Sequence, residues 1–186
     1  MSVLGRGRTS DVYLVRNSQP ATVMKCFKTN YLPFLQIELE NLKQLVDCSN
    51  IPKVQFVAKE FLVLFPKGEP VRYFHPQYVR QLINLLCVVH SRGIVHRDIR
   101  PSNLLEVNGT IYLIDWGFAT VTGSLNTFQG TFHYAADDVL MTKDLSQFRY
   151  LPKYDLYSVV RCVFIFAHRY LRKTLDRFTI EEEKEF

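Results

Sequence analysis

Residues 93–117 read GIVHRDIRPSNLLEVNGTIYLIDWG, and this stretch decides the fold. Its apolar runs at 104–107 and 110–114 flank Asn108-Gly109. An Asn-Gly pair between alternating apolar residues is the strongest short signal for a β-hairpin. The stretch therefore predicts a hairpin with a polar turn before it and an acidic strand end after it.

Three side chains around this hairpin are candidates for chemistry. Asp98 and Asn103 precede its first strand, and together they suit a hydroxyl group and a cation. Asp115 closes the second strand, at a strand end where a carboxylate commonly binds metal. Because each of these short motifs also occurs by chance, none of them defines a site alone.

The residues before the hairpin predict a small sheet with one helix, built from short strands and one run of leucines at helical spacing. The expected strands are 12–15, 22–27, 53–57 and 60–65, and the expected helix is 33–46. The turn-forming residues 17–20 make the first two strands an antiparallel hairpin.

Two long helices are expected in the second half. Residues 77–91 are apolar at helical spacing and stop before Gly93, which can take the left-handed conformation of a helix C-cap. Residues 154–171 form the second predicted helix, and 181–185 are an acidic tail. Residues 117–134 are rich in Gly, Ser and Thr, and a long loop of this kind is usually functional.

The amino-terminal region holds a candidate phosphate-binding set. Gly5 and Gly7 leave backbone amides open to phosphate oxygens, although an ordinary turn explains the same pattern. Lys25 lies within a strand and reaches phosphate only if that strand pairs with the glycine turn. Glu38 and Glu40 on the helix are the two candidates to hold the lysine, and Glu38 is preferred for its spacing to the following leucine.

Taken in order, these features resemble the eukaryotic protein kinase family. The resemblance rests on the glycine turn, the strand lysine, the helix glutamate, the HRD tripeptide at 96–98 with Asn103, and the DWG tripeptide at 115–117. It covers about residues 2–171. Five ordered motifs in a matching context are highly specific.

The resemblance implies a site for ATP and Mg²⁺. Asp98 would accept or orient the proton of the substrate hydroxyl, and Lys25 and Arg100 would offset phosphate charge. Asn103 and Asp115 would ligate Mg²⁺. The implied nucleotide-binding residues are Leu4, Gly5, Gly7, Val12, Lys25, Glu38, Phe65 and Lys67.

The implied fold is α+β and kinase-like. Residues 1–68 would form a β-rich N-lobe with one helix, and residues 69–186 a shortened, mainly helical C-lobe. The implied activity is transfer of the γ-phosphate of Mg²⁺-ATP to a Ser or Thr hydroxyl of a protein substrate. Thr131 in the frame GTxxY favours Ser/Thr as the acceptor. An arginine two residues after the aspartate, as at Arg100, also occurs in tyrosine kinases. Residues 130–134 resemble a platform for a protein substrate, which argues against a small-molecule acceptor.

Several departures favour a different class, a kinase-like decoy or regulator that binds another kinase or its substrate. Asp137-Asp138 replaces the family's Pro-Glu, and the shortened acid fits a missing arginine partner. Several C-terminal family helices have no counterpart, which would expose apolar surface on 154–171 and favour a homodimer or a kinase partner. Trp116 replaces a phenylalanine but is an equally large apolar anchor.

Arg97 leaves two readings open. It either pairs with a phosphate added to the loop or only braces that loop. The candidate phosphorylation sites are Thr120, Thr122, Ser124, Thr127 and Thr131.

Composition bounds the remaining classes. The 186 residues are 47% hydrophobic and 22% charged, as in a folded globular protein, and the net charge of +5 comes from scattered basic residues. We therefore expect no nucleic-acid partner. The apolar run 159–167 is too short to span a bilayer, so no membrane association is expected. Four widely spaced cysteines predict reduced core thiols and an intracellular location, cytoplasmic or nuclear.

Overall fold

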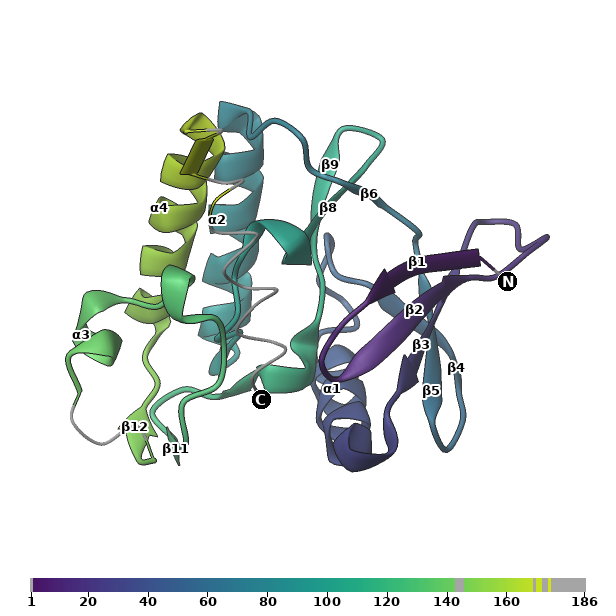
Figure 1. Cartoon of the computed structure of the whole chain (residues 1–186), viewed down its shortest axis with the longest axis horizontal. Coiled ribbons are helices and arrows are strands. Elements are labelled where there is room, and N and C mark those ends of the chain that lie inside the picture. The colour runs from purple at the N-terminus through teal and green to yellow at the C-terminus, as the bar shows by residue number, and fades with distance from the viewer. Residues whose placement is uncertain (1, 143–145, 169, 172–173, 175–186) are drawn as a thin grey trace.

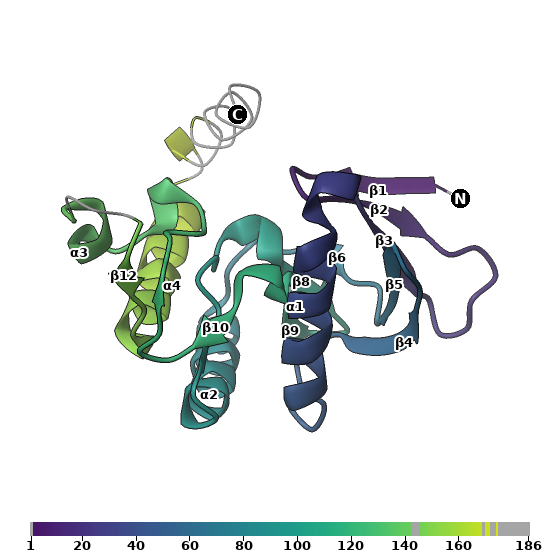
Figure 2. The same cartoon turned by 90° about the horizontal axis from the view of Figure 1, so that it is seen from below.

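The computed structural model describes residues 2–142, 146–168, 170, 171 and 174. Figure 1 shows the sheet of the amino-terminal half on one side and two long helices, α2 and α4, on the other. Helix α1 lies between the sheet and α2 when the molecule is seen from below (Figure 2). This β-rich part and the four α-helices of the described chain agree with the expected α+β fold.

The amino-terminal sheet is antiparallel with strand order β1-β2-β3-β5-β4. Its strands are β1 (Ser2–Arg6), β2 (Ser10–Leu14), β3 (Val23–Phe27), β4 (Lys53–Val57) and β5 (Phe61–Phe65). The predicted hairpin and the two later strands are confirmed. Strand β1 was not predicted as such, because the sequence marks it only by its glycines.

Helix α1 (Leu32–Gln44) follows a 3-10 turn, η1 (Thr29–Tyr31), and confirms the predicted helix within two residues at each end. A proline in the first turn suits a helix start, where its missing N–H costs nothing. Its buried side chains recur at helical spacing and face the sheet and the segment after β9; they are Leu35, Glu38, Leu39, Asn41 and Leu42.

The quoted stretch folds as predicted around its Asn-Gly turn. Strands β8 (Leu104–Val107) and β9 (Thr110–Leu113) pair as a hairpin. Asn108 and Gly109 have φ of 51° and 76°, and two positive φ values are what a type I′ turn requires. Strand β6 (Glu69–Pro70) extends this sheet, and η2 (Pro101–Asn103) leads into it.

Helices α2 (Pro76–Ser91) and α4 (Pro152–Ala167) pack side by side in both views (Figures 1 and 2). The end of α2 matches the prediction, and Gly93 has the expected left-handed φ of 73°. Helix α4 ends four residues before the predicted position 171.

The predicted loop 117–134 contains short regular pieces. They are η3 (Trp116–Phe118), β10 (Thr120–Val121), β11 (Leu125–Asn126) and η4 (Phe132–Tyr134), followed by α3 (Asp137–Leu140). Strand β10 pairs with β7 (Ile94–Val95), and β11 with β12 (Phe148–Arg149). Two-residue strands leave no periodic pattern, which is why the sequence indicated only a loop. The predicted tail 181–185 lies outside the described residues.

All four cysteines are free, but they are not all core residues as expected. Cys48 and Cys162 are buried and Cys26 is partly buried, whereas Cys87 is exposed on α2. The apolar run around Cys87 does not indicate this exposure, because a helix exposes one face even where most of its residues are apolar. Within the described residues, no helix is both long and apolar enough to cross a membrane.

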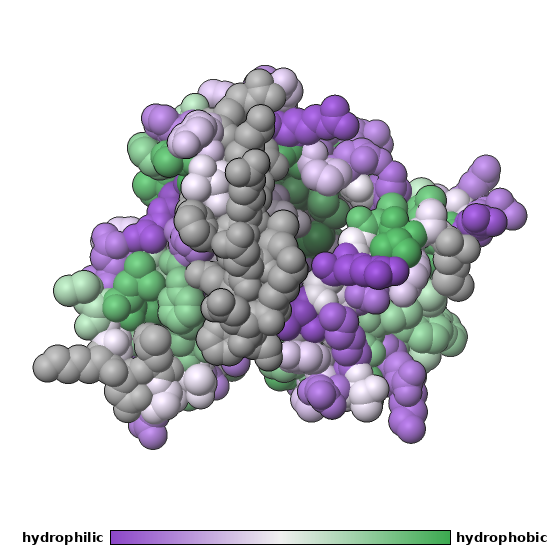
Figure 3. Space-filling model, in the orientation of Figure 1, coloured by the Kyte–Doolittle hydropathy of each residue, from purple (hydrophilic) through white to green (hydrophobic). Residues whose placement is uncertain are grey.

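Hydrophobic side chains reach the surface at several places on the face seen in Figure 3, among them over β1 and over α3. On α4, the exposed apolar residues are Leu156, Tyr157, Val160, Val163 and Phe164. Exposed apolar surface on this helix was expected.

Candidate active site

Lys25 lies in the middle of the sheet and at the centre of a buried charge cluster. It sits on β3, opposite Val12 of β2, and only 6% of the residue is exposed. Its Nζ lies 2.5 Å from Oε2 of Glu38 and 2.8 Å from Oδ1 of Asp115. Glu40, the other glutamate considered, is exposed and accepts a hydrogen bond from Gln36. Strand, helix and the end of the β9 hairpin therefore meet at one ammonium group.

The charges of this cluster depend on one another. Burial opposes the charged form of Lys25, but the carboxylates of Asp115 and Glu38 outweigh it and raise the pKa of the lysine. Burial raises the pKa of Glu38, even beside the lysine. Burial also opposes ionisation of Asp115, yet the Lys25 ammonium lowers the pKa of that carboxyl group. Lys25 therefore stays charged, and Asp115 is the carboxylate that ionises readily.

Asp98 is buried and surrounded by donors. Its Oδ1 accepts a hydrogen bond from the Thr131 hydroxyl at 2.8 Å. Its Oδ2 accepts one from Nδ2 of Asn103 at 2.9 Å and lies 3.3 Å from Nε of Arg100. Asn103 also donates to the backbone oxygen of Asp98. These contacts fix the direction of the Asp98 carboxylate.

Asp98 and Asp115 are joined through the backbone between them. The backbone oxygen of Asn103 accepts a hydrogen bond from Ile114, the neighbour of Asp115. His96 reaches the same strand end, because its Nε2 lies 3.0 Å from the oxygen of Ile114. The structure thus brings Asp98, Asn103 and the Lys25 cluster to one place.

Asp155, at the start of α4, supports residues 96–103, the candidate catalytic loop. Its carboxylate accepts hydrogen bonds from the backbone N–H groups of His96 (2.8 Å) and Arg97 (2.9 Å) and lies 2.9 Å from Nε2 of His90. Arg97 has a φ of 77°, a conformation that needs such support in a residue other than glycine. The sequence did not predict this role for Asp155.

Asn41 and Trp116 connect α1 to the segment that carries Asp115. The Asn41 side chain donates to the backbone oxygens of Trp116 and Ala119, each at 3.2 Å. Trp116 is fully buried, donates from Nε1 to the oxygen of Leu113, and packs edge-on against His96. The tryptophan therefore acts as the apolar anchor expected from its size, whereas Asn41 was not predicted.

Other residues implied for nucleotide binding lie on β1, in the turn after β1, and at and after the end of β5. Gly5 lies on β1 and Gly7 in the turn after it, where the Gly7 N–H donates to the oxygen of Ser10. Leu4 is exposed on β1, and Phe65 ends β5. Lys67 lies two residues after the end of β5.

Lys67, one of the residues that the resemblance implies at the nucleotide, has both its backbone N–H and its side chain engaged in this structure. The Lys67 backbone N–H donates to the oxygen of Ala21 at 2.9 Å, so it is not open to a base. The Lys67 side chain pairs with Glu69.

The polar residues present fit a nucleotide-bound Mg²⁺. Both hydrogens of the Asn103 amide are directed at Asp98, which leaves its Oδ1 as an acceptor for a cation. Asp115 uses Oδ1 for Lys25, and its Oδ2 remains for a second contact. The described residues contain no cluster of three His, Cys, Asp or Glu side chains. Mg²⁺ needs none, because it commonly binds one or two carboxylates together with substrate phosphates.

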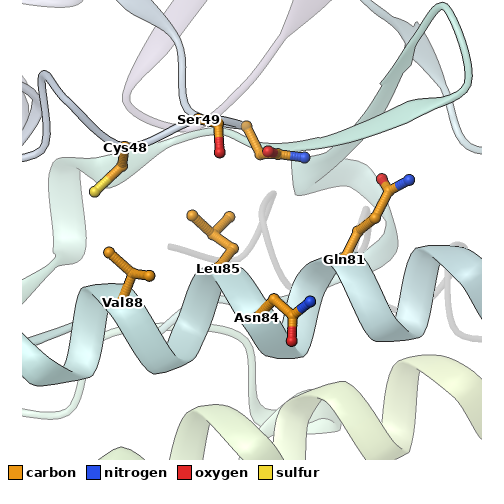
Figure 4. Close-up of a pocket in the computed structure, with 7 residues that line it drawn as sticks. Cys48, Ser49, Gln81, Asn84, Leu85 and Val88 are labelled. Carbon is orange, nitrogen blue, oxygen red and sulfur yellow. The ribbon is translucent and has the colours of Figure 1, made fainter.

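A separate cavity of about 250 Å³ lies between the α1–β4 connection and α2 (Figure 4). Leu85 and Val88 of α2 point toward Cys48 and Ser49 across it. It contains none of the candidate active-site residues. The cavity is therefore not part of the site described above.

Two ion pairs attach the end of the loop to α4. Asp138 lies 2.5 Å from Lys153, and Asp137 pairs with Arg161. The family's arginine partner was expected to be missing, and within the described residues the ion pair of Asp138 is with a lysine instead. A lysine on α4 reaches the shortened acid, and its neighbour Asp137 takes the arginine.

Gly130 lies directly against the catalytic loop and gives a testable prediction. Its φ is 126°, and a Cβ there would lie 2.4 Å from the Arg97 oxygen, about 1 Å inside ordinary contact. We expect Gly130→Ala to push Thr131 away from Asp98 and, for the kinase activity that the resemblance implies, to lower kcat/KM for peptide phosphorylation by about tenfold to 100-fold.

The matched control for this change is Gly123→Ala. Gly123 also has positive φ, 78°, but a Cβ there would meet nothing closer than 3.9 Å. That variant carries backbone strain without displacement, so it is expected to retain its kcat/KM. Equal losses in both variants would show that strain alone matters.

Comparison with known proteins agrees with this geometry. Residues 71–175 match the family model described as the protein kinase domain. Because the match covers more than half of the chain, the chain belongs to the protein kinase family.

Named relatives include plant and fungal kinases. The chain is 29% identical to CBL-interacting serine/threonine-protein kinase 19 of Arabidopsis thaliana over 76% of this chain and 35% of that protein. It is 36% identical to CBL-interacting protein kinase 28 of Oryza sativa subsp. japonica over 90% of this chain and 44% of that protein. An Aurora kinase of Eremothecium gossypii is 26% identical over 78% and 47%. The chain thus spans less than half the length of these relatives.

Proposed function

We propose that this chain is a protein kinase that transfers the γ-phosphoryl group of Mg²⁺-ATP to a Ser or Thr hydroxyl of a protein substrate. One observation carries the proposal: Lys25, Glu38 and Asp115 form one buried cluster, linked through the backbone to Asp98 and Asn103. Phosphoryl transfer requires alignment and charge neutralisation more than covalent chemistry from the protein.

Each residue has a distinct part in this proposal. Glu38 and Asp115 hold the Lys25 ammonium in place for the nucleotide phosphates. Asp98 accepts the proton of the acceptor hydroxyl, and Arg100 beside it supplies positive charge. Asn103 and Asp115 would hold Mg²⁺, which when bound would neutralise charge on the phosphates.

The remaining nucleotide contacts are proposed from position. Gly5 and Gly7 would cover the phosphates, and Leu4 and Val12 would lie above the nucleotide. Phe65 and the carbonyl groups near Lys67 would border the base.

The hydrogen bond from Thr131 to Asp98 supports Ser/Thr as acceptor, because it fixes the segment of the GTxxY frame beside the catalytic carboxylate. The Arabidopsis thaliana relative named above as a serine/threonine-protein kinase supports the same acceptor class.

Lys25→Met tests the proposal. Loss of the ammonium removes a preorganised cation from the phosphates, so kcat/KM for peptide phosphorylation is expected to fall about 100-fold. The assay uses labelled ATP, Mg²⁺ and a Ser/Thr peptide, with folding checked by circular dichroism. Lys59→Met, in the exposed β4–β5 turn, is the control and is expected to retain wild-type activity. A folded Lys25→Met variant with wild-type activity would contradict the assignment.

The decoy or regulator remains the alternative, and the exposed apolar face of α4 is the observation that favours it. If the protein is a decoy, the wild type and the Asp98→Asn variant would bind a kinase partner or a second copy equally well. Transfer above the Asp98→Asn level by wild type would decide for the enzyme. We retain the intracellular location and the absence of a nucleic-acid partner as predictions.

A further inference from the structure

Arg97 is already engaged in this structure by groups other than a phosphate. Its guanidinium carbon lies 4.0 Å from the centre of the Tyr150 ring, within cation–π range. One of its terminal nitrogens donates to the backbone oxygen of Thr127 at 2.6 Å. Its Nε makes no hydrogen bond within the described residues, so the aromatic ring is the main group that meets this part of the cation.

Tyr150 in turn holds the loop by its hydroxyl group. Its hydroxyl oxygen accepts a hydrogen bond from the Gln129 N–H at 3.0 Å, and the hydroxyl donates to the Gln129 oxygen at 3.3 Å. Both backbone polar groups of Gln129 are thus taken by one side chain. Tyr150 is buried and packs edge-on against Phe148, so its ring is fixed from behind.

These contacts lie next to the catalytic carboxylate. Thr127 and Gln129 are followed by Gly130, which touches the Arg97 backbone, and by Thr131, which donates to Asp98. Residues 127–131 are therefore fixed near one end by Arg97 and Tyr150 and at the other end by Asp98.

The cavity between Arg97 and the Tyr150 ring is too small for a phosphate group. The cavity bounded by Arg97, Phe128, Tyr150 and Tyr154 has a volume of about 10 Å³. That is about the volume required by one water molecule. The tyrosine ring covers a face of the Arg97 guanidinium beside this cavity.

We propose that Tyr150 is a positioning residue that replaces a loop phosphate. The Arg97–Tyr150 stack and the Tyr150–Gln129 hydrogen bonds hold residues 127–131 where Thr131 meets Asp98, without any phosphorylation. Of the two readings open for Arg97, the structure favours the brace. This inference rests on the proposed kinase function.

The first test removes phosphate from the full chain. The protein is treated with a phosphatase, and mass spectrometry verifies that residues 115–138 carry none. We expect kcat/KM for a Ser/Thr peptide to stay within about twofold of the untreated protein, because the brace needs no phosphate. If untreated protein is active and treated protein is not, the proposal is overturned.

The second test changes the tyrosine. Tyr150→Leu removes ring and hydroxyl, and kcat/KM is expected to fall about tenfold with the nucleotide-induced melting shift retained. Tyr150→Phe keeps the stack and is expected to recover most of that loss. Tyr157→Leu, at an exposed tyrosine of α4, is the control and is expected to match wild type. A folded Tyr150→Leu variant with wild-type kcat/KM would overturn the proposal.

Hydrogen exchange separates this inference from the proposed function. The Gln129 amide is expected to exchange faster in Tyr150→Phe than in wild type, because its acceptor is lost. Unchanged exchange would contradict the brace whether or not the protein is active. If wild type transfers no more phosphate than Asp98→Asn while Gln129 responds as expected, the proposed function fails, and the brace remains only as a structural contact without the catalytic role proposed here.

Discussion

Asp98→Asn is expected to lower kcat for peptide phosphorylation by about 100-fold to 10,000-fold, the range over which a positioned general base contributes. Asparagine fits the same space and can still accept a hydrogen bond from Thr131. It cannot take the proton of the acceptor hydroxyl. The loss is therefore expected in kcat, with the affinity for Mg²⁺-ATP retained.

The measurement is a steady-state assay with labelled ATP, supported by nucleotide titration of both proteins. Asp47→Asn is the matched control, because Asp47 is exposed after α1 and is not one of the site residues. If Asp98→Asn binds nucleotide normally and transfers phosphate at the wild-type rate, Asp98 is not the base.

Asp155→Ala is expected to lower the free energy of unfolding by about 3–5 kcal/mol, as when one partner of a buried charged network is removed. The change leaves the N–H groups of His96 and Arg97 without their acceptor. It also removes the partner of His90. Since Arg97 has a left-handed backbone conformation, the catalytic loop is expected to loosen first.

Urea denaturation of wild type and variant measures this difference. Asp47→Ala, which removes an exposed carboxylate, is expected to change stability by no more than about 0.5 kcal/mol. A loss below about 1 kcal/mol in Asp155→Ala would show that water or other groups replace the acceptor.

Local patterns in the sequence predicted much of this fold. The leucine spacing of α1, the Asn-Gly turn and Gly93 each act within a few residues, and each was correct. Glu38 could be preferred to Glu40 because helical spacing ties one side chain to the buried face. These features depend on short-range geometry that a sequence displays directly.

Contacts between distant residues were the part that could not be predicted. The carboxylate of Asp155 supports residues 58 and 59 positions earlier in the chain, and no local pattern marks that pairing. The same holds for Tyr150, whose ring meets Arg97 only because the loop folds back between them. The prediction that Cys87 is a core residue was wrong, because an apolar run does not indicate which face of a helix is covered.

The central claim is that Lys25, Asn103 and Asp115 serve one metal-bound nucleotide, and thermal unfolding with ATP tests it most directly. For wild type, we expect ATP to raise Tm, and Mg²⁺ to increase that rise. For Asp115→Asn, we expect the increase due to Mg²⁺ to disappear. A wild-type Tm that ATP leaves unchanged would contradict the account. So would an increase of that rise by Mg²⁺ that persists in Asp115→Asn.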